Sequence, residues 1–124
     1  MNLVQDYLAL ATEIASFNKY DNKTLVKEYN RKISQMRNLA SKIEQSNPDS
    51  KTEFCNLLSH KNNTIRLWVS HHILEVMTCE KKFRKSALKE IRNIAKTDKT
   101  ANSLGEKLWL KEWYKTHPED RWLR

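Results

Sequence analysis

Glycine is nearly absent from this sequence, whose 124 residues contain one glycine and only two prolines. β-Sandwiches and β-barrels need turn residues at short intervals, and Rossmann or P-loop sites need glycine-rich loops that surround phosphate groups. A single glycine supplies neither, so the composition excludes most nucleotide-binding enzymes. The composition instead predicts an all-α protein of one domain, spanning residues 1–124.

Cysteine and long apolar runs are also scarce. Cys55 and Cys79 form no Cys-x-x-Cys motif, and although a disulfide between them is conceivable, two such thiols are more typical of a reduced protein core. No stretch approaches the roughly 18 apolar residues that span a bilayer, and the N-terminus lacks the basic start of a signal peptide. We therefore expect a cytoplasmic protein that does not contact membranes.

The sequence offers no convincing metal site. His71 and His72 are adjacent, so on a helix their side chains point about 100° apart and cannot chelate one ion. A zinc site that combines His72 and Cys79 with Cys55 or His60 is conceivable, but structural zinc prefers closely paired ligands. We expect His72 to fill a gap in the core, and we expect no metal or cofactor.

Catalytic motifs are missing in the same way. No Ser–His–Asp order, His-Glu-x-x-His motif or carboxylate dyad is present. Glu106 lies next to Lys107, and Glu112 lies near Lys111 and Lys115, which predicts solvated surface pairs of little energetic weight. The sequence therefore favours a protein that is not an enzyme.

Helical periodicity covers nearly the whole chain and predicts five or six helices. Short links between them favour antiparallel αα-hairpins. We expect Asp21 or Asn22 to cap the second helix, and Ser50 with Glu53 to form a capping box for the third. The segment 64–77 is apolar on most sides, which predicts a central helix. The expected helices cover residues 3–17, 23–45, a short stretch through 54–58, 64–77, 80–96 and, after a break at 98–100, a last helix that Pro118 ends. Residues 1–46 thus form an N-terminal helix pair, and residues 117–124 form a short tail.

Positive charge is concentrated near the C-terminus. The net charge is +8, and residues 81–124 carry 13 basic and six acidic residues, or +7 of that total. On a helical wheel one set of cations falls within about 80° of arc, away from the apolar face. This basic ridge, our candidate for partner binding, comprises Lys81, Lys85, Lys89, Arg92 and Lys96.

Three interpretations of the basic ridge remain open. A lysine-rich helix face is commonly only solvated, but it can also attract an acidic protein surface or follow a nucleic-acid backbone. Trp109, Trp113, Tyr114 and Trp122 could stack on bases, although the spacing of the first three is more typical of a core. Lysines outnumber arginines 16 to seven, and no groove-reading motif is evident.

Two segments carry a family resemblance. Leu57-Leu58, a polar link at residues 60–63 and the run Ile65-Arg66-Leu67-Trp68 form the first; Leu110-Lys111-Glu112-Trp113 forms the second. Over residues 50–116 the chain resembles a small bacterial family of HEAT-like helical domains of unknown function, with Val69-Ser70 where alanines are usual.

The resemblance implies both a fold and a role. It implies a HEAT-like right-handed superhelix of αα-hairpins. Members of this family accompany polymorphic-toxin genes, including contact-dependent growth-inhibition loci. The resemblance therefore implies an immunity protein that binds and neutralises a cognate toxin domain, and it transfers no catalytic residues. The alternative is a nucleic-acid-associated helical protein that uses the basic ridge of residues 81–96.

Overall fold

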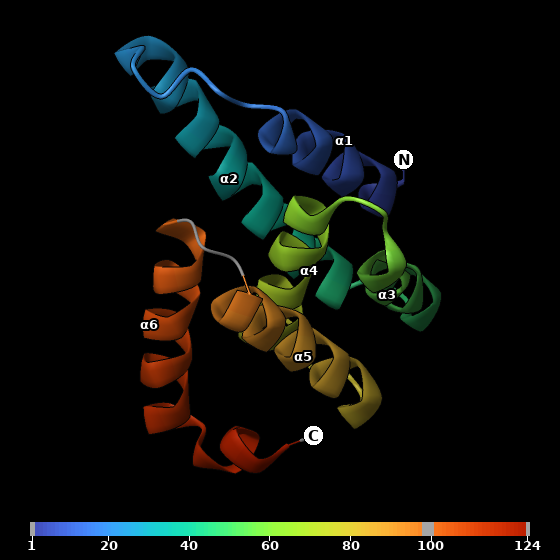
Figure 1. Cartoon of the computed structure of the whole chain (residues 1–124). Helices are drawn as coiled ribbons and strands as arrows, with labels where there is room; N and C mark the ends of the chain where they lie inside the picture. The colour runs from blue at the N-terminus through green and yellow to red at the C-terminus, as the bar shows by residue number, and fades with distance from the viewer. Residues whose placement is uncertain (1, 98–100, 124) are drawn as a thin grey trace.

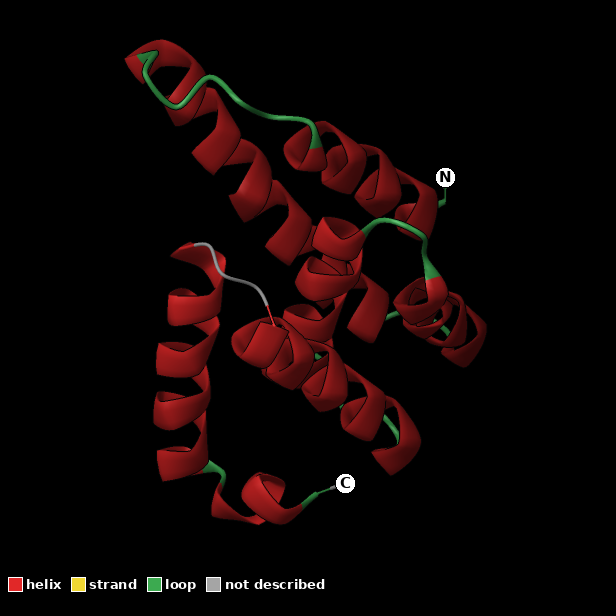
Figure 2. Ribbon diagram, viewed as in Figure 1, coloured by secondary structure: helices red, strands yellow, loops and turns green. Residues whose placement is uncertain are grey.

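The structure is a computed structural model that describes residues 2–97 and 101–123, and in these residues it contains helices and no strand (Figure 2). The predicted all-α class is therefore confirmed. The expected break at residues 98–100 lies outside the described residues. The helices are α1 (Leu3–Ala15), α2 (Lys23–Glu44), α3 (Pro48–Cys55), α4 (Asn63–Glu75), α5 (Lys81–Thr97) and α6 (Ala101–Thr116), with 3-10 helices η1 (Asn56–Ser59) and η2 (Pro118–Trp122).

Asparagine side chains begin four of these helices. Each amide oxygen accepts a hydrogen bond from a backbone N–H of the first turn, which has no partner within the helix. The capping residues are Asn2, Asn22, Asn47 and Asn62. The prediction that Asp21 or Asn22 caps the second helix is confirmed, with Asn22 as the capping residue. The expected capping box of Ser50 and Glu53 is wrong, because Asn47 caps α3 and Pro48 occupies its first turn, where the missing N–H costs nothing.

Helix α4 occupies the centre of the molecule, as its apolar circumference predicted. Helices α1 and α2 form an antiparallel pair on one side of it, and α5 and α6 lie on the other (Figure 1). Ile65, Val69 and Ile73 of α4 are buried, and so are its polar residues Ser70 and His72. A single cluster of buried side chains, from Val4 of α1 to Leu110 of α6, joins both sides through α4.

Tyr7 of the N-terminal helix is buried in this core, where its ring and its hydroxyl both have partners. The Tyr7 ring packs edge-on against Phe54 of α3, with centroids 4.7 Å apart. Its hydroxyl lies 2.6 Å from Nδ1 of His72, so the buried imidazole has a partner. The expected core position of His72 is confirmed. None of the helices among the described residues has the length and apolar character needed to cross a bilayer.

Candidate functional site

A groove of about 1000 Å³ runs along α5, and four of the five residues of the basic ridge line it. Its walls come from α5, from Leu58 of η1 and from Arg121 of η2, and we call it the basic groove. Its charged lining residues are Lys85, Lys89, Arg92, Lys96 and Arg121, with Glu90 as the acid. The groove thus has five cationic side chains and one anionic side chain.

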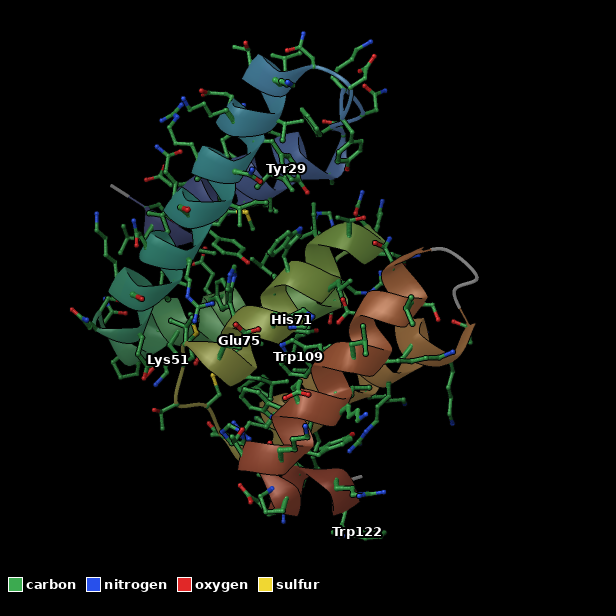
Figure 3. The ribbon with its side chains drawn as sticks, turned by 90° about the vertical axis from the view of Figure 1, so that its left-hand side faces the viewer. Tyr29, Lys51, His71, Glu75, Trp109 and Trp122 are labelled. Carbon is green, nitrogen blue, oxygen red and sulfur yellow. The ribbon has the colours of Figure 1, made fainter. Side chains whose placement is uncertain are left out.

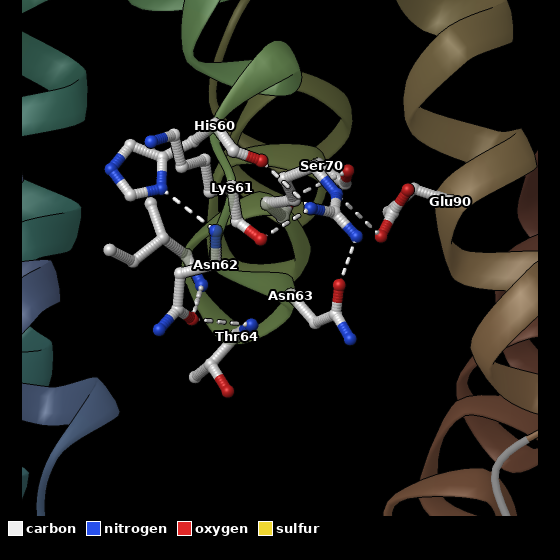
Figure 4. A network of polar contacts seen from close by, with 9 residues as sticks. His60, Lys61, Asn62, Asn63, Thr64, Ser70 and Glu90 are labelled. Atoms are coloured by element: carbon white, nitrogen blue, oxygen red, sulfur yellow. Dashed lines mark hydrogen bonds and ion pairs between the residues drawn. The ribbon is translucent and has the colours of Figure 1, made fainter.

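The acid of the basic groove is already neutralised within the protein. Glu90 accepts a hydrogen bond from Nε of Arg66, and the two atoms are 3.1 Å apart. The same guanidinium donates to the backbone carbonyls of His60 and Lys61 and to the side chain of Asn63 (Figure 4). The loop before α4 therefore fixes Arg66 against α5, and Glu90 subtracts little from the positive potential of the groove.

Four of the five predicted ridge residues are available to a partner. Lys81, Lys89 and Lys96 are exposed and Lys85 is half-buried. None of the four forms an ion pair with any residue in the described ranges. Lys85, Lys89 and Lys96 line the basic groove, whereas Lys81 lies at the first turn of α5, outside it. The structure thus brings three of the predicted lysines into one concave surface.

Arg92, the fifth ridge residue, does not point away from the protein as the wheel indicated. Its guanidinium donates to the Tyr114 hydroxyl at 2.8 Å and to the backbone carbonyls of Asp120 and Leu123, each at 2.6 Å. The Asp120 carbonyl also accepts the backbone N–H of Leu123 at 3.2 Å, so Arg92 binds the turn that ends η2. Arg92 therefore holds the C-terminal segment on α5, and its role in the groove is structural.

Asp120 is the second attachment point of this segment, and sequence reasoning missed it. Asp120 is only 3% exposed. Its Oδ2 atom accepts hydrogen bonds from Nη2 of Arg84 at 2.6 Å and from Nε1 of Trp113 at 2.8 Å. Residues 117–124 were expected to form a short tail. Residues 118–122 instead form η2, which packs on α6 and closes one side of the groove.

The same turn adds a cation and an aromatic ring to the groove edge. Arg121 lines the groove, and its guanidinium lies 5.8 Å from the ring of Trp122, which is 73% exposed. Trp109, Trp113 and Tyr114 behave differently, since they are partly buried against the core as their spacing indicated. No local signal predicts Arg121, because it approaches α5 only through the fold of η2.

A second polar cluster ties α6 to α4. His71 lies between two carboxylates, with Nε2 2.6 Å from Glu106 and Nδ1 3.0 Å from Glu75. Glu75 also accepts hydrogen bonds from Arg37 and from Nε1 of Trp109. Figure 3 labels His71, Glu75 and Trp109 of this cluster. The prediction of a solvated surface pair is therefore wrong for Glu106, which pairs with His71 instead. For Glu112 the prediction is confirmed, because Glu112 forms a solvent-exposed ion pair with Lys115.

The two carboxylates decide the charge of His71. Burial alone lowers the pKa of His71, but hydrogen bonds with Glu106 and Glu75, and the charges of both, outweigh burial and raise the pKa to about 9. For Glu75, burial alone raises the pKa, but hydrogen bonds from His71 and Arg37 outweigh burial and lower the pKa to about 2. Both imidazole nitrogens thus have a carboxylate partner, and the protonated His71 links α4 to α6.

The neighbouring His72 has the opposite character. Burial lowers its pKa to about 4, so the ring is neutral at pH 7 and accepts or donates one hydrogen bond with Tyr7. It also stacks with Trp68, at a centroid distance of 5.9 Å. Within the described part of the chain, no three His, Cys, Asp or Glu side chains are arranged to hold a metal ion.

Comparison with known proteins gave no match, whether to protein-family models, to curated proteins or to solved structures.

Proposed function

We propose that the chain is a protein-binding module that receives an acidic surface of its partner in the basic groove. The observation that carries this proposal is the groove itself, in which Lys85, Lys89, Lys96 and Arg121 have no ion-pair partner among the described residues. Complementary charge accelerates association and disfavours wrong partners. A concave surface of this kind supports selective recognition of an acidic protein without chemistry of its own.

The partner we propose is a bacterial toxin domain, which the chain binds in the cytoplasm and neutralises as an immunity protein. This proposal rests on the family resemblance of residues 50–116, together with the groove. A nuclease toxin has a basic substrate groove, and a basic inhibitor does not fit it. The expected contact is therefore an acidic surface of the toxin, away from any nucleic-acid groove.

The test is protection from toxicity. We expect the gene immediately upstream of this chain to encode a large secreted protein, and the C-terminal domain of that protein is the toxin domain to test. Expressed in a bacterial host, this domain should arrest growth, and co-expression of the chain should restore it. The chain with Lys85→Glu and Lys89→Glu, folded to the same extent, should protect less well. Undiminished growth arrest in the presence of the wild-type chain would contradict the immunity role.

Nucleic acid is a second candidate partner, because Trp122 is exposed beside Arg121 at the edge of the basic groove. Exposed aromatic rings next to cations stack on the bases of single strands. This candidate predicts that single-stranded oligonucleotides bind at about 50 mM salt and change the fluorescence of Trp122. Absence of binding at that salt concentration would exclude it.

A further inference from the structure

The two cysteines lie side by side, although 24 residues separate them in the sequence. Cys55 is the last residue of α3, and Cys79 lies in the connection between α4 and α5. Both are free thiols, and their sulfur atoms are 3.6 Å apart. Cys55 is only 2% exposed, whereas Cys79 is partly exposed. Of the two residues, Cys79 is therefore the one that is accessible to solvent.

The Glu44 carboxylate holds the segments on both sides of this cysteine pair. Lys51, one turn before Cys55 on α3, donates to Glu44 of α2 at 2.9 Å. The other carboxylate oxygen of Glu44 accepts the backbone N–H of Thr78, the residue before Cys79, at 3.1 Å. The α3 helix and the α4–α5 connection are thus bound to the same carboxylate, and the fold itself holds the two sulfur atoms close together.

The surroundings give the two thiols different reactivities. A hydrogen bond from the Cys55 thiol lowers the pKa of Cys79; the charges of Lys51 and Arg84 add to this effect, while burial and Glu44 oppose it. The same hydrogen bond, followed by burial, raises the pKa of Cys55. Because the thiolate is the reactive form of cysteine, Cys79 is the nucleophile and Cys55 supplies the second sulfur atom.

We propose that Cys55 and Cys79 form a reversible intramolecular disulfide when the protein meets hydrogen peroxide. The Cys79 thiolate attacks the peroxide oxygen, the O–O bond breaks, and Cys79 becomes a sulfenic acid while hydroxide leaves and takes up a proton. Cys55 then attacks the Cys79 sulfur, forming the S–S bond and releasing a second water molecule. Two thiols are oxidised and one hydrogen peroxide is reduced to two water molecules, and a dithiol reductant then restores both thiols and is itself oxidised to a disulfide.

The disulfide would join the end of α3 covalently to the connection between α4 and α5. Closing it requires the sulfur atoms to approach by about 1.5 Å, which side-chain rotation can supply. A cross-link over a loop of this length restricts the unfolded chain, so the oxidised protein should melt roughly 5–15 °C above the reduced protein. The fold around Glu44 need not change.

The test uses the purified, reduced full-length protein treated with a small molar excess of hydrogen peroxide. Intact mass spectrometry should show loss of the mass of two hydrogen atoms, thiol alkylation should be blocked at both cysteines, and dithiothreitol should reverse both changes. The thermal shift should appear and disappear with them. Addition of oxygen to Cys79 without loss of two hydrogens, or disulfide-linked dimers alone, would overturn the proposal.

Two variants separate the roles of the thiols. Cys55→Ser should leave a sulfenic acid on Cys79 that dimedone traps, whereas Cys79→Ser should give neither a dimedone adduct nor a disulfide. Cys55→Ala is a second form of the first variant, in case serine disturbs the buried site. Equal dimedone labelling of the two single variants would contradict the assignment of Cys79 as the attacking thiol.

Discussion

Replacing Asp120 with alanine is expected to lower the free energy of unfolding by about 2–4 kcal/mol. The Asp120 carboxylate is the common acceptor for Arg84 and for the indole N–H of Trp113. Its removal leaves a partly buried guanidinium and an indole N–H without their partner. Because the backbone carbonyl of Asp120 also binds Arg92, the loss should loosen the attachment of η2 to α5.

The control for this prediction is the adjacent residue. Glu119 is exposed, so Glu119→Ala removes the same charge from the same turn and should change stability by less than about 0.5 kcal/mol. Urea unfolding followed by tryptophan fluorescence measures both variants. A loss for Asp120→Ala no larger than that for Glu119→Ala would show that η2 does not depend on this carboxylate.

The stability of the wild-type protein should be greatest near pH 6.5 and should fall on both sides, because His71 and His72 have pKa shifts of opposite sign. The folded-state pKa of His72 is lowered to about 4. Its contribution is therefore complete above the unfolded-state pKa near 6.5 and is lost as the pH falls toward 4. The full loss amounts to about 3 kcal/mol. The Glu75 contribution is lost only below about pH 4.5, as the pH falls toward 2.

The alkaline side depends on His71. Its folded-state pKa is raised to about 9, so its contribution is complete below pH 6.5 and is lost as the pH rises through 9. The expected loss is again about 3 kcal/mol. It reflects the weakening of the contact between α4 and α6, because a neutral imidazole cannot donate to both Glu75 and Glu106.

Substituting each histidine alone distinguishes the two effects. His72→Gln should flatten the stability profile between pH 4.5 and 6.5, and His71→Gln should flatten it between pH 6.5 and 9. Urea unfolding at fixed ionic strength across this range measures both. A wild-type profile that is flat from pH 4.5 to 9, or variants that flatten the wrong side, would refute the assignment.

The helices were predictable because their signals are local. Apolar spacing and capping residues such as Asn22 act within a few turns, so the sequence alone located α1, α2, α4 and α5 closely. The start of α3 was mistaken where two local signals competed. Asn47 with Pro48 caps the helix ahead of Ser50 because a proline fits the first turn without losing a hydrogen bond.

The functional surface was predictable only in part, because its remaining pieces meet through the tertiary fold. Lys85, Lys89 and Lys96 share a helix face, and periodicity is sufficient to align them. Arg121 joins them from the end of the chain, and Arg92 is diverted to backbone carbonyls that no periodicity reveals. Glu106 was misjudged for the same reason, since its partner His71 lies on another helix.

The most direct test of the basic groove as a binding surface is the association rate with the toxin domain against which the chain protects. Stopped-flow measurements at low and moderate salt would compare the wild-type chain with two triple variants. The groove variant carries Lys85→Glu, Lys89→Glu and Lys96→Glu, and the control carries Lys23→Glu, Lys27→Glu and Lys42→Glu on the exposed face of α2.

The groove variant should associate about 10–100 times more slowly than the wild-type chain at low salt and should lose most of the salt dependence. The control should stay close to the wild-type rate, and both variants should remain folded. Equal rates for the groove variant and the wild-type chain, or equal slowing by both variants, would contradict the basic groove as the binding surface.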